Sequence, residues 1–414
     1  MAKSVSNSSA FPFEWLRNHL VNDILPHWLD ATVTENGFFW PQLDRQWQRR
    51  SPGFATLVSQ SRLVSVFSIG YAITGEKAYR EAAAAGADFL LRAFDDRIHG
   101  GWHWSCDPEG KLLDEKKDCY GHAFAIYGLA HAYRATKDSR YRKAAERTWD
   151  VVDSRFRDKR GGLVWHMTAD FRPMDSQRSQ NPMMHMFEAL TELADAAGDR
   201  SGRSDGQFIL PAQRIADFLF LPIADNDLPP LPEIYDLEWT PVPSAAGVGA
   251  GGDPAVARAC PVRSDTGGYS AGGHLFEWAF LLSMAVERGM DAAYMRFAER
   301  CLRNATDLAY DREHPGVITQ VSLEGKPVNY AKSFWEPCEA IRALLHFAVR
   351  HGRTDLLPAC RDILGFVQQH FVDPEHGGFY ANLTREGAIV NAVKGSEWKV
   401  DYHTTGMCAE AIRK

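Results

Sequence analysis

Apolar residues recur at spacings of three and four along most of the chain, which predicts one amphipathic helix after another. Strongly apolar helices alternate with helices that have one polar face, so the two kinds should have different surroundings. The predicted helices cover residues 13–31, 57–74, 79–94, 120–135, 141–156, 182–197, 209–220, 274–288, 292–310, 334–350 and 356–371, and another begins near His403.

The connections between these helices alternate in length. A short turn follows several of the strongly apolar helices, whereas long loops precede them, often with a Gly-Gly pair that is typical of a hairpin. Segments 96–102, 158–163 and 373–379 resemble one another, and each follows an amphipathic helix. The chain therefore contains an internal repeat of about 60 residues, in which each unit is a helix pair with a hairpin loop.

Six such pairs that close on themselves predict an all-α fold, a single (α/α)6 barrel with one domain over residues 1–414. The strongly apolar helices would form the inner ring, because they are packed on all sides, and the amphipathic helices would form the outer ring. The long loops, with their short β-hairpins, then gather at the end where the inner helices begin. That end is the candidate site, because loops held by a rigid scaffold often carry function.

One stretch, at about 223–273, is longer than the repeat allows. It begins with a proline-rich segment at 229–232 and continues into a Gly/Ala-rich segment at 245–252. A surface insertion is the simpler interpretation. A mobile lid over the site is the alternative, because the stretch leads directly into His274.

Composition narrows the class of protein. A formal net charge of −7 argues against nucleic acid or an anionic membrane as a partner. Neither a signal peptide at the start nor an apolar run long enough to span a membrane is evident. The seven cysteines are an odd number and include no C-x-x-C pair, so the sequence predicts neither a disulfide framework nor a structural zinc site, and favours a reducing cytoplasm.

Ionisable and aromatic residues recur at or near the starts of the predicted inner helices. They are Arg62, Tyr120, His122, Asn181, His185, His274, Glu277, Trp335, Glu336, Glu339, Trp398 and His403. Any one of them could be structural, since a histidine in a first turn is often a cap or a satisfied core residue. Their convergence from six helices at one end of a barrel nevertheless predicts a pocket with acid/base chemistry.

The predicted positions favour neutral histidines. The positive end of a helix dipole lowers the pKa of an imidazole in the first turn, and a neutral imidazole can take up a proton and return it. Glu277 could orient His274, which lies three residues before it. Three histidines with glutamates could hold a metal, but no H-E-x-x-H motif or similar spacing is present, and no phosphate-binding glycine loop occurs. The sequence therefore predicts a site with neither a metal nor a cofactor.

Several local motifs together resemble the N-acylglucosamine 2-epimerase superfamily. They are Ser61-Arg62, the run from Tyr120 to Phe124, the run from Asn181 to Glu188, Gly273-His274-x-x-Glu277, Trp335-x-x-x-Glu339 and Trp398-Lys399-x-x-Tyr402-His403. The resemblance implies an (α/α)6 barrel that epimerises or isomerises a monosaccharide without a metal or cofactor. It implies His274 and His403 as catalytic residues, and as sugar-holding or orienting residues Arg62, Tyr120, Asn181, His185, Glu277, Trp335, Glu339 and Trp398.

The Glu277-Trp278 step is similar to the mannose isomerase and sulfoquinovose isomerase branch of that superfamily. It implies conversion of D-mannose to D-fructose, with D-lyxose to D-xylulose as a second pair, through a cis-enediol. His403 would take the C2 proton, with His274 assisting. A sugar 2-epimerase is the alternative, and a glycoside hydrolase that uses glutamates, or a non-catalytic binding toroid, is more remote.

Overall fold

A computed structural model describes residues 11–198, 206–224, 230–244 and 268–413. The first ten residues, for which the sequence predicts no signal peptide, lie outside the described residues, and so does the Gly/Ala-rich segment at 245–252. Within the described part of the chain, no helix combines the length and the apolar character that crossing a bilayer requires. The cytoplasmic location and the single domain over residues 1–414 stay predictions.

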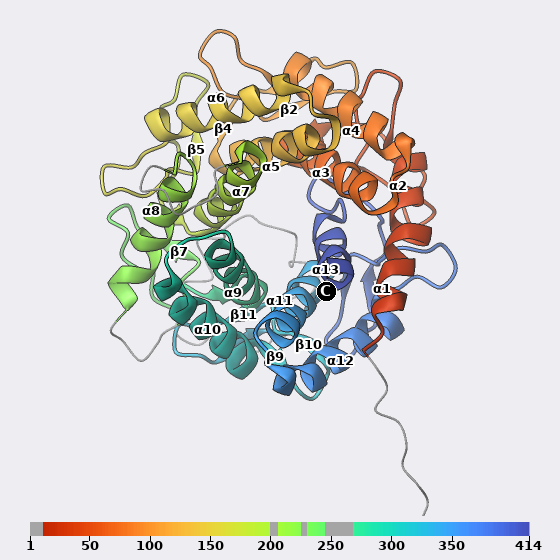
Figure 1. Cartoon of the computed structure of the whole chain (residues 1–414), viewed down its shortest axis with the longest axis vertical. Helices are drawn as coiled ribbons and strands as arrows, with labels where there is room; N and C mark the ends of the chain where they lie inside the picture. Colours follow the sequence, from red (N-terminus) through yellow and green to blue (C-terminus); the bar gives the residue numbers. More distant parts are fainter. Residues whose placement is uncertain (1–10, 199–205, 225–229, 245–267, 414) are drawn as a thin grey trace, which may run out of the picture.

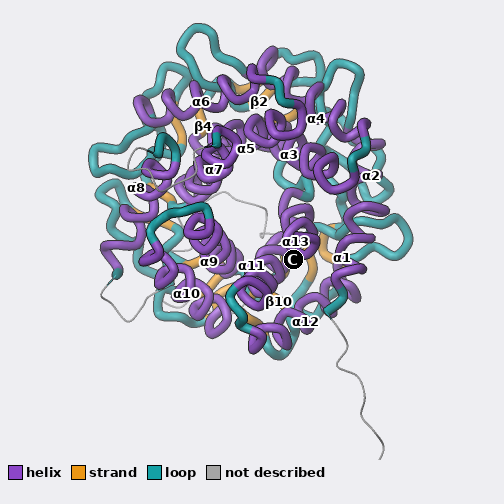
Figure 2. The backbone as a smooth tube through the Cα atoms, viewed as in Figure 1, coloured by secondary structure: helices purple, strands orange, loops and turns teal. Residues whose placement is uncertain are grey.

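Two concentric rings of helices form a toroid (Figures 1 and 2). The inner ring consists of α3 (Leu57–Thr74), α5 (Cys119–Thr136), α7 (Asn181–Ala197), α9 (Gly272–Glu287), α11 (Trp335–Arg350) and α13 (Tyr402–Arg413). The outer ring consists of α1 (Phe13–His19) with α2 (Leu25–Thr32), then α4 (Lys77–Phe89), α6 (Ser139–Arg155), α8 (Ile209–Phe220), α10 (Met295–Asn304) and α12 (Leu357–Phe366). The predicted (α/α)6 barrel is confirmed.

The apolar character of each helix explains its ring. Almost every residue of α3 from Leu57 to Ser68 is buried, because this helix packs against both its inner neighbours and the outer ring. In α6, buried positions such as Ala144 and Trp149 alternate with exposed ones, which leaves one face in water. The all-round apolar pattern and the one-sided pattern therefore separate the inner from the outer helices.

Several outer helices contain a wider turn that the sequence did not predict. Four π-helical turns lie at Leu20–Ile24, Leu90–Phe94, Ala305–Ala309 and Val367–Phe371. The last three of them end a helix that the sequence predicted as regular to about the same residue. Apolar spacing of three and four does not distinguish a terminal π turn from an α turn, so the pattern locates these helix ends without giving their geometry.

Short antiparallel strands join the repeats at the end where the inner helices begin. The sheets are β1 (Ala55–Thr56), β2 (Ser105–Cys106) and β3 (Leu112–Asp114); β4 (Lys117–Asp118) and β5 (His166–Met167); β6 (Arg178–Ser179) and β7 (Ile234–Tyr235); β8 (Ser270–Ala271), β11 (Gln320–Val321) and β12 (Pro327–Asn329); β9 (Tyr310–Asp311) and β10 (Gly316–Val317); and β13 (Lys332–Ser333), β14 (Asn382–Leu383) and β15 (Ile389–Asn391). Strands β1, β4 and β8 each run directly into an inner helix, so the sheets fix where those helices start.

Buried ion pairs recur in the hairpin loops with nearly the same sequence separation. We call their acidic members the loop aspartates. The pairs are Asp96 with Lys117, Asp158 with Arg178, Asp311 with Lys332, and Asp373 with Lys394, separated by 21, 20, 21 and 21 residues. Each loop aspartate also accepts hydrogen bonds from backbone amides two or three residues further on. The same kind of ion pair thus holds four of the long loops in place.

Candidate active site

The predicted site residues come together around the central axis because they occupy the first turns of inner helices. Asn181, His274, Trp335 and His403 lie in the first turns of α7, α9, α11 and α13, and Tyr120 lies in that of α5. All eight residues proposed to hold or orient the sugar belong to the inner helices or to the loop before α13. The contacts below give their arrangement.

His274 is held by a carboxylate that the sequence did not reveal. Its Nδ1 lies 2.8 Å from Oε2 of Glu233 and 3.1 Å from Nε2 of Gln180, which also donates to Glu233 at 2.8 Å. Trp278 Nε1 in turn donates to Gln180 Oε1 at 2.7 Å. The expected orienting residue, Glu277, is therefore replaced in this role by Glu233.

The same series of hydrogen bonds gives Trp278 a role in positioning His274. Its fully buried indole holds the amide of Gln180, the amide donates to Glu233, and Glu233 binds His274. The tryptophan that follows Glu277 in the sequence is thus linked to the orientation of the imidazole on the same helix.

His403, on α13, is held in an equivalent way. Its Nδ1 lies 2.7 Å from Oε1 of Glu339, and Arg342 Nη1 donates to the other oxygen of Glu339 at 3.4 Å. Both histidines therefore have a carboxylate on Nδ1, which leaves Nε2 as the nitrogen that can exchange a proton with a substrate.

Trp335 lies between the two imidazoles. Its ring centroid is 5.1 Å from that of His274 and 5.3 Å from that of His403. Gly273 permits this approach, since a Cβ there would lie 2.4 Å from the Trp335 ring. The glycine before His274 is required because the indole of α11 crosses the start of α9 at this point.

Glu277 occupies the centre of the arrangement. One of its carboxylate oxygens is 4.0 Å from His185 Nδ1, and among the described residues neither oxygen has a hydrogen-bond partner. Glu277 belongs to two groups of residues whose ligand atoms all lie within 4.8 Å of one another, one with His185 and His274 and one with Glu339 and His403. Its carboxyl group therefore lies between the two histidines.

Arg62 forms part of the site wall. It donates to the Tyr120 hydroxyl at 2.6 Å and to the backbone oxygen of Trp398 at 3.1 Å. Its guanidinium carbon is 4.1 Å from the centroid of Phe124 and 5.0 Å from that of Tyr402. This charge is 3% exposed and no carboxylate forms an ion pair with it in the described part of the chain, which suits a group that stabilises a developing anion.

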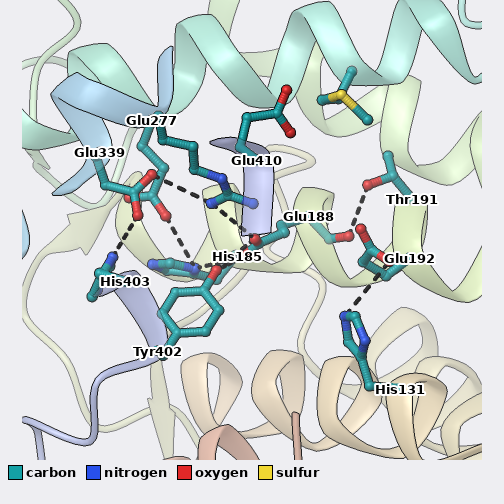
Figure 3. A network of polar contacts seen from close by, with 12 residues as sticks. His131, His185, Glu188, Thr191, Glu192, Glu277, Glu339, Tyr402, His403 and Glu410 are labelled. Carbon is teal, nitrogen blue, oxygen red and sulfur yellow. Dashed lines mark hydrogen bonds and ion pairs between the residues drawn. The ribbon is translucent and has the colours of Figure 1, made fainter. Parts of the chain in front are cut away.

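Glu188 contacts both His185 and Tyr402 and so connects them (Figure 3). The Tyr402 hydroxyl donates to both Glu188 oxygens at 2.5 Å, and His185 Nδ1 is 3.2 Å from one of them. Neither Glu188 nor Tyr402 was predicted as a site residue, although both fall within the quoted motifs. Their positions within those motifs were the sequence signal that could have identified them as site residues.

Two further residues complete the list. Asn181 is buried, and its side-chain oxygen has no hydrogen-bond partner in the described part of the chain. Trp398 packs on Trp104, with ring centroids 5.8 Å apart. By contrast, the candidate His122 is structural, since its Nδ1 lies 2.8 Å from the Asp118 carbonyl and its Nε2 accepts from Trp102 N.

Burial sets the charges at the site. It lowers the pKa of His403 well below its usual range and that of His185 to about 4, so both are neutral near pH 7. Burial raises the pKa of Glu277 well above its usual range, and the charges of Glu339 and Glu188 raise it further. Burial also raises the pKa of Glu339, but the charge and hydrogen bond of Arg342 oppose that rise. Glu339 is therefore the easier of the two to ionise, and Glu277 is a neutral acid.

An (α/α)6 toroid with two carboxylate-bound histidines on its inner helices is thus a scaffold for proton transfer. The sequence profile of the N-acylglucosamine 2-epimerase (GlcNAc 2-epimerase) family matches residues 37–407, so the chain belongs to this family of sugar-converting enzymes. The resemblance seen in the sequence is confirmed at the level of the family.

Individual relatives carry two different activities. The chain is similar to a cellobiose 2-epimerase from Bacteroides fragilis, with 24% identity over 96% of this chain and 97% of the relative. It is also similar to a D-mannose isomerase from Marinomonas mediterranea, with 26% identity over 87% of each. A crystal structure of D-mannose isomerase superposes with a TM-score of 0.85 at 24% identity, covering 98% of this chain and 100% of that one, which shows the shared fold.

Proposed function

We propose that the protein is an aldose–ketose isomerase that interconverts D-mannose and D-fructose, with D-lyxose and D-xylulose as a second pair. The proton would move from C2 to C1 through a cis-enediol. The observation that carries this proposal is the pair of imidazoles on either side of Trp335, each with a carboxylate on Nδ1. Two such groups can remove a proton at one carbon and assist its transfer between oxygens.

His403 is the proposed base at C2. Burial keeps its imidazole neutral at pH 7, so Nε2 can accept a proton. Glu339, bound to Nδ1, stabilises the imidazolium that then forms, and Arg342 favours the ionised form of Glu339 by opposing the rise in pKa that burial causes. The same imidazolium returns the proton to C1 of the enediol.

His274 is the proposed partner for ring opening and for proton transfer between O1 and O2. Glu233 keeps its Nδ1 side occupied. Arg62 would stabilise negative charge on the enediolate oxygens, because its buried guanidinium already binds a neutral hydroxyl, that of Tyr120, and carries no paired carboxylate among the described contacts. The remaining residues proposed to hold the sugar are Tyr120, Asn181, His185, Glu277, Trp335, Glu339 and Trp398.

The test is incubation with D-mannose, D-lyxose, D-glucose and cellobiose in D₂O, followed by NMR. Formation of fructose from mannose supports the proposal, with deuterium at C1 to the extent that the imidazolium of His403 exchanges its proton with solvent. His403→Ala and His274→Ala should each lower turnover by about 10²–10⁴-fold while leaving the fold intact. His314→Ala is the matched control, since only its backbone makes the contacts to Asp311 and Lys332. Near-normal turnover by either site variant would refute the assignment.

A sugar 2-epimerase is the second candidate, favoured by the cellobiose 2-epimerase among the relatives. The same histidines would then return the proton to the opposite face of C2. In D₂O this reaction places deuterium at C2 of an aldose and forms no ketose. Mannose from glucose, or a glucosyl-mannose from cellobiose, would select this candidate over the isomerase.

A further inference from the structure

A second cavity lies at the other end of the toroid, where the inner helices end. Its volume is about 480 Å³, and we call it the lower cavity. It is lined by the C-terminal halves of α3, α5, α9 and α13 and by the middle of α7 and α11. Because a helix rises 1.5 Å per residue, Met284 in its wall lies about 15 Å along α9 from His274. The lower cavity therefore extends away from the two catalytic histidine candidates and reaches the surroundings of the site at Glu188 and Arg342.

The lining of the lower cavity combines an apolar wall with an excess of positive charge. Five cationic side chains line it, Arg134, Lys137, Arg288, Arg342 and Arg413, against three acidic ones, Glu188, Glu192 and Glu410. Phe280, Leu281, Met284, Tyr71, Ile73 and Ile412 supply the apolar part. A volume of this size and mixed character is typical of small-molecule sites.

Several of the cations have an ordinary structural explanation. Arg134 and Arg288 pair with Glu192, and Arg413 pairs with Glu410. Basic residues near helix C-termini also complement the helix dipole. These pairs alone would form no binding site.

Arg342 also has carboxylate neighbours, Glu339 at 3.4 Å and Glu188 at 4.0 Å, but these do not account for all of its surroundings. It lies in the middle of α11, eight residues before Arg350, so the helix dipole does not explain it. Its side chain is 10% exposed, and its guanidinium carbon packs 3.9 Å from the Phe280 ring centroid. The guanidinium also packs against Gly406, where a Cβ would lie 3.3 Å from the same carbon. Within the described chain, its Nε is a buried donor without a hydrogen-bond partner, which is unfavourable unless something binds there.

We propose that the lower cavity binds a small organic anion, a carboxylate or phosphate on an apolar body, with its charged group against Arg342. A guanidinium is the side chain best suited to both anions, and the apolar wall would hold the rest of the ligand. Binding in the lower cavity does not depend on the proposed reaction.

The same arginine connects the lower cavity to the candidate active site. Arg342 Nη1 is 3.4 Å from Glu339 Oε2, and Glu339 binds His403 through its other oxygen; Figure 3 shows the Glu339–His403 contact. An anion on Arg342 competes with Glu339 for the guanidinium. We therefore infer that the bound anion weakens the hold of Glu339 on His403 and acts as an effector; this second step rests on the proposed function.

Calorimetry on the full chain tests the binding directly. The probes are phenyl phosphate and phenylacetate, with inorganic phosphate and acetate as the charged groups alone. Saturable 1:1 binding of at least one phenyl compound, tighter than its charged group alone, supports the proposal, and which one binds separates phosphate from carboxylate. Ala409→Trp, which fills the lower cavity from α13, should weaken binding by about tenfold or more.

Ala293→Trp, on an exposed turn before α10, is the matched control and should leave binding unchanged. Binding that survives Ala409→Trp, or the absence of saturable binding by both phenyl compounds, overturns the proposal. Coupling is measured without turnover, as a change in the imidazole NMR signal of His403 on adding the bound probe. An unchanged signal would overturn the effector role while leaving the binding site and the proposed reaction in place.

Discussion

Two sets of buried carboxyl groups in this barrel have opposite surroundings. Each loop aspartate lies against a lysine or arginine about 20 residues further on and accepts backbone amides. The glutamates near the starts of the inner helices have fewer hydrogen-bond partners. Glu277 and Glu336 are fully buried, and among the described residues none of their carboxylate oxygens has a hydrogen-bond partner.

The difference in surroundings reverses the charge. Burial opposes ionisation of Asp311, but Arg385, a loop amide and Lys332 outweigh it and lower its pKa to about 2. At Glu336 burial outweighs the opposing effects of its own amide, His274, Ser333 and Lys332 and raises the pKa to about 7. The loops thus use ionised carboxylates to hold position, whereas the centre keeps neutral acids available for a substrate.

The largest expected effect is on stability, from breaking one loop pair. Asp373→Asn leaves Lys394, whose side chain is 0% exposed, as a buried charge without its carboxylate. The free energy of unfolding should fall by about 3–5 kcal/mol, measured by urea denaturation. Glu375→Gln is the control, because it touches the same Arg45 but is 65% exposed and should cost less than about 1 kcal/mol. Equal losses in the two variants would contradict the distinction.

The sequence predicted the hairpin loops better than the contacts of the central glutamates. The hairpin repeats were visible because Asp and Gly recur at fixed places, and helix starts placed His274 and His403 at one end. Glu233 was missed because it lies 41 residues before His274, in a segment that breaks the repeat, and only the closed ring brings the two together. Charge state depends on such long-range contacts, so Glu277 was predicted to orient His274 and instead has no hydrogen-bond partner in the described chain.

The second prediction concerns the pH dependence of stability. Glu336 has a folded pKa of about 7 against 4.5 as a free group, so between these values the folded state binds more protons than the unfolded state. Stability should therefore fall as pH rises from 4.5 to 7, by about 3 kcal/mol from this group, and then level off. Unfolding by urea at each pH measures it. Glu336→Gln should remove this slope, and a slope that persists in the variant would assign it to another group.

The third prediction separates charge from chemistry at Glu277. If Glu277 is a neutral acid, Glu277→Gln exchanges one neutral group for another, and stability should change by less than about 1 kcal/mol. Sugar turnover should nevertheless fall by about 10–100-fold, because the amide can no longer move a proton. Parallel urea denaturation and NMR turnover assays check both. A loss of stability as large as that of Asp373→Asn would show that Glu277 is ionised.

The smallest expected effect, none at all, concerns metal removal. The ligand atoms of Glu277, Glu339 and His403 lie within 4.8 Å of one another, as do those of His185, His274 and Glu277, so both groups could hold an ion. A divalent cation would need Glu277 deprotonated, against the strong effect of its burial. We therefore expect dialysis against EDTA to leave turnover unchanged. Loss of turnover that Mn²⁺ or Zn²⁺ restores would mean that the missing partner of Glu277 is a metal ion, and the contrast with the loop aspartates would then be one of cation type rather than of charge.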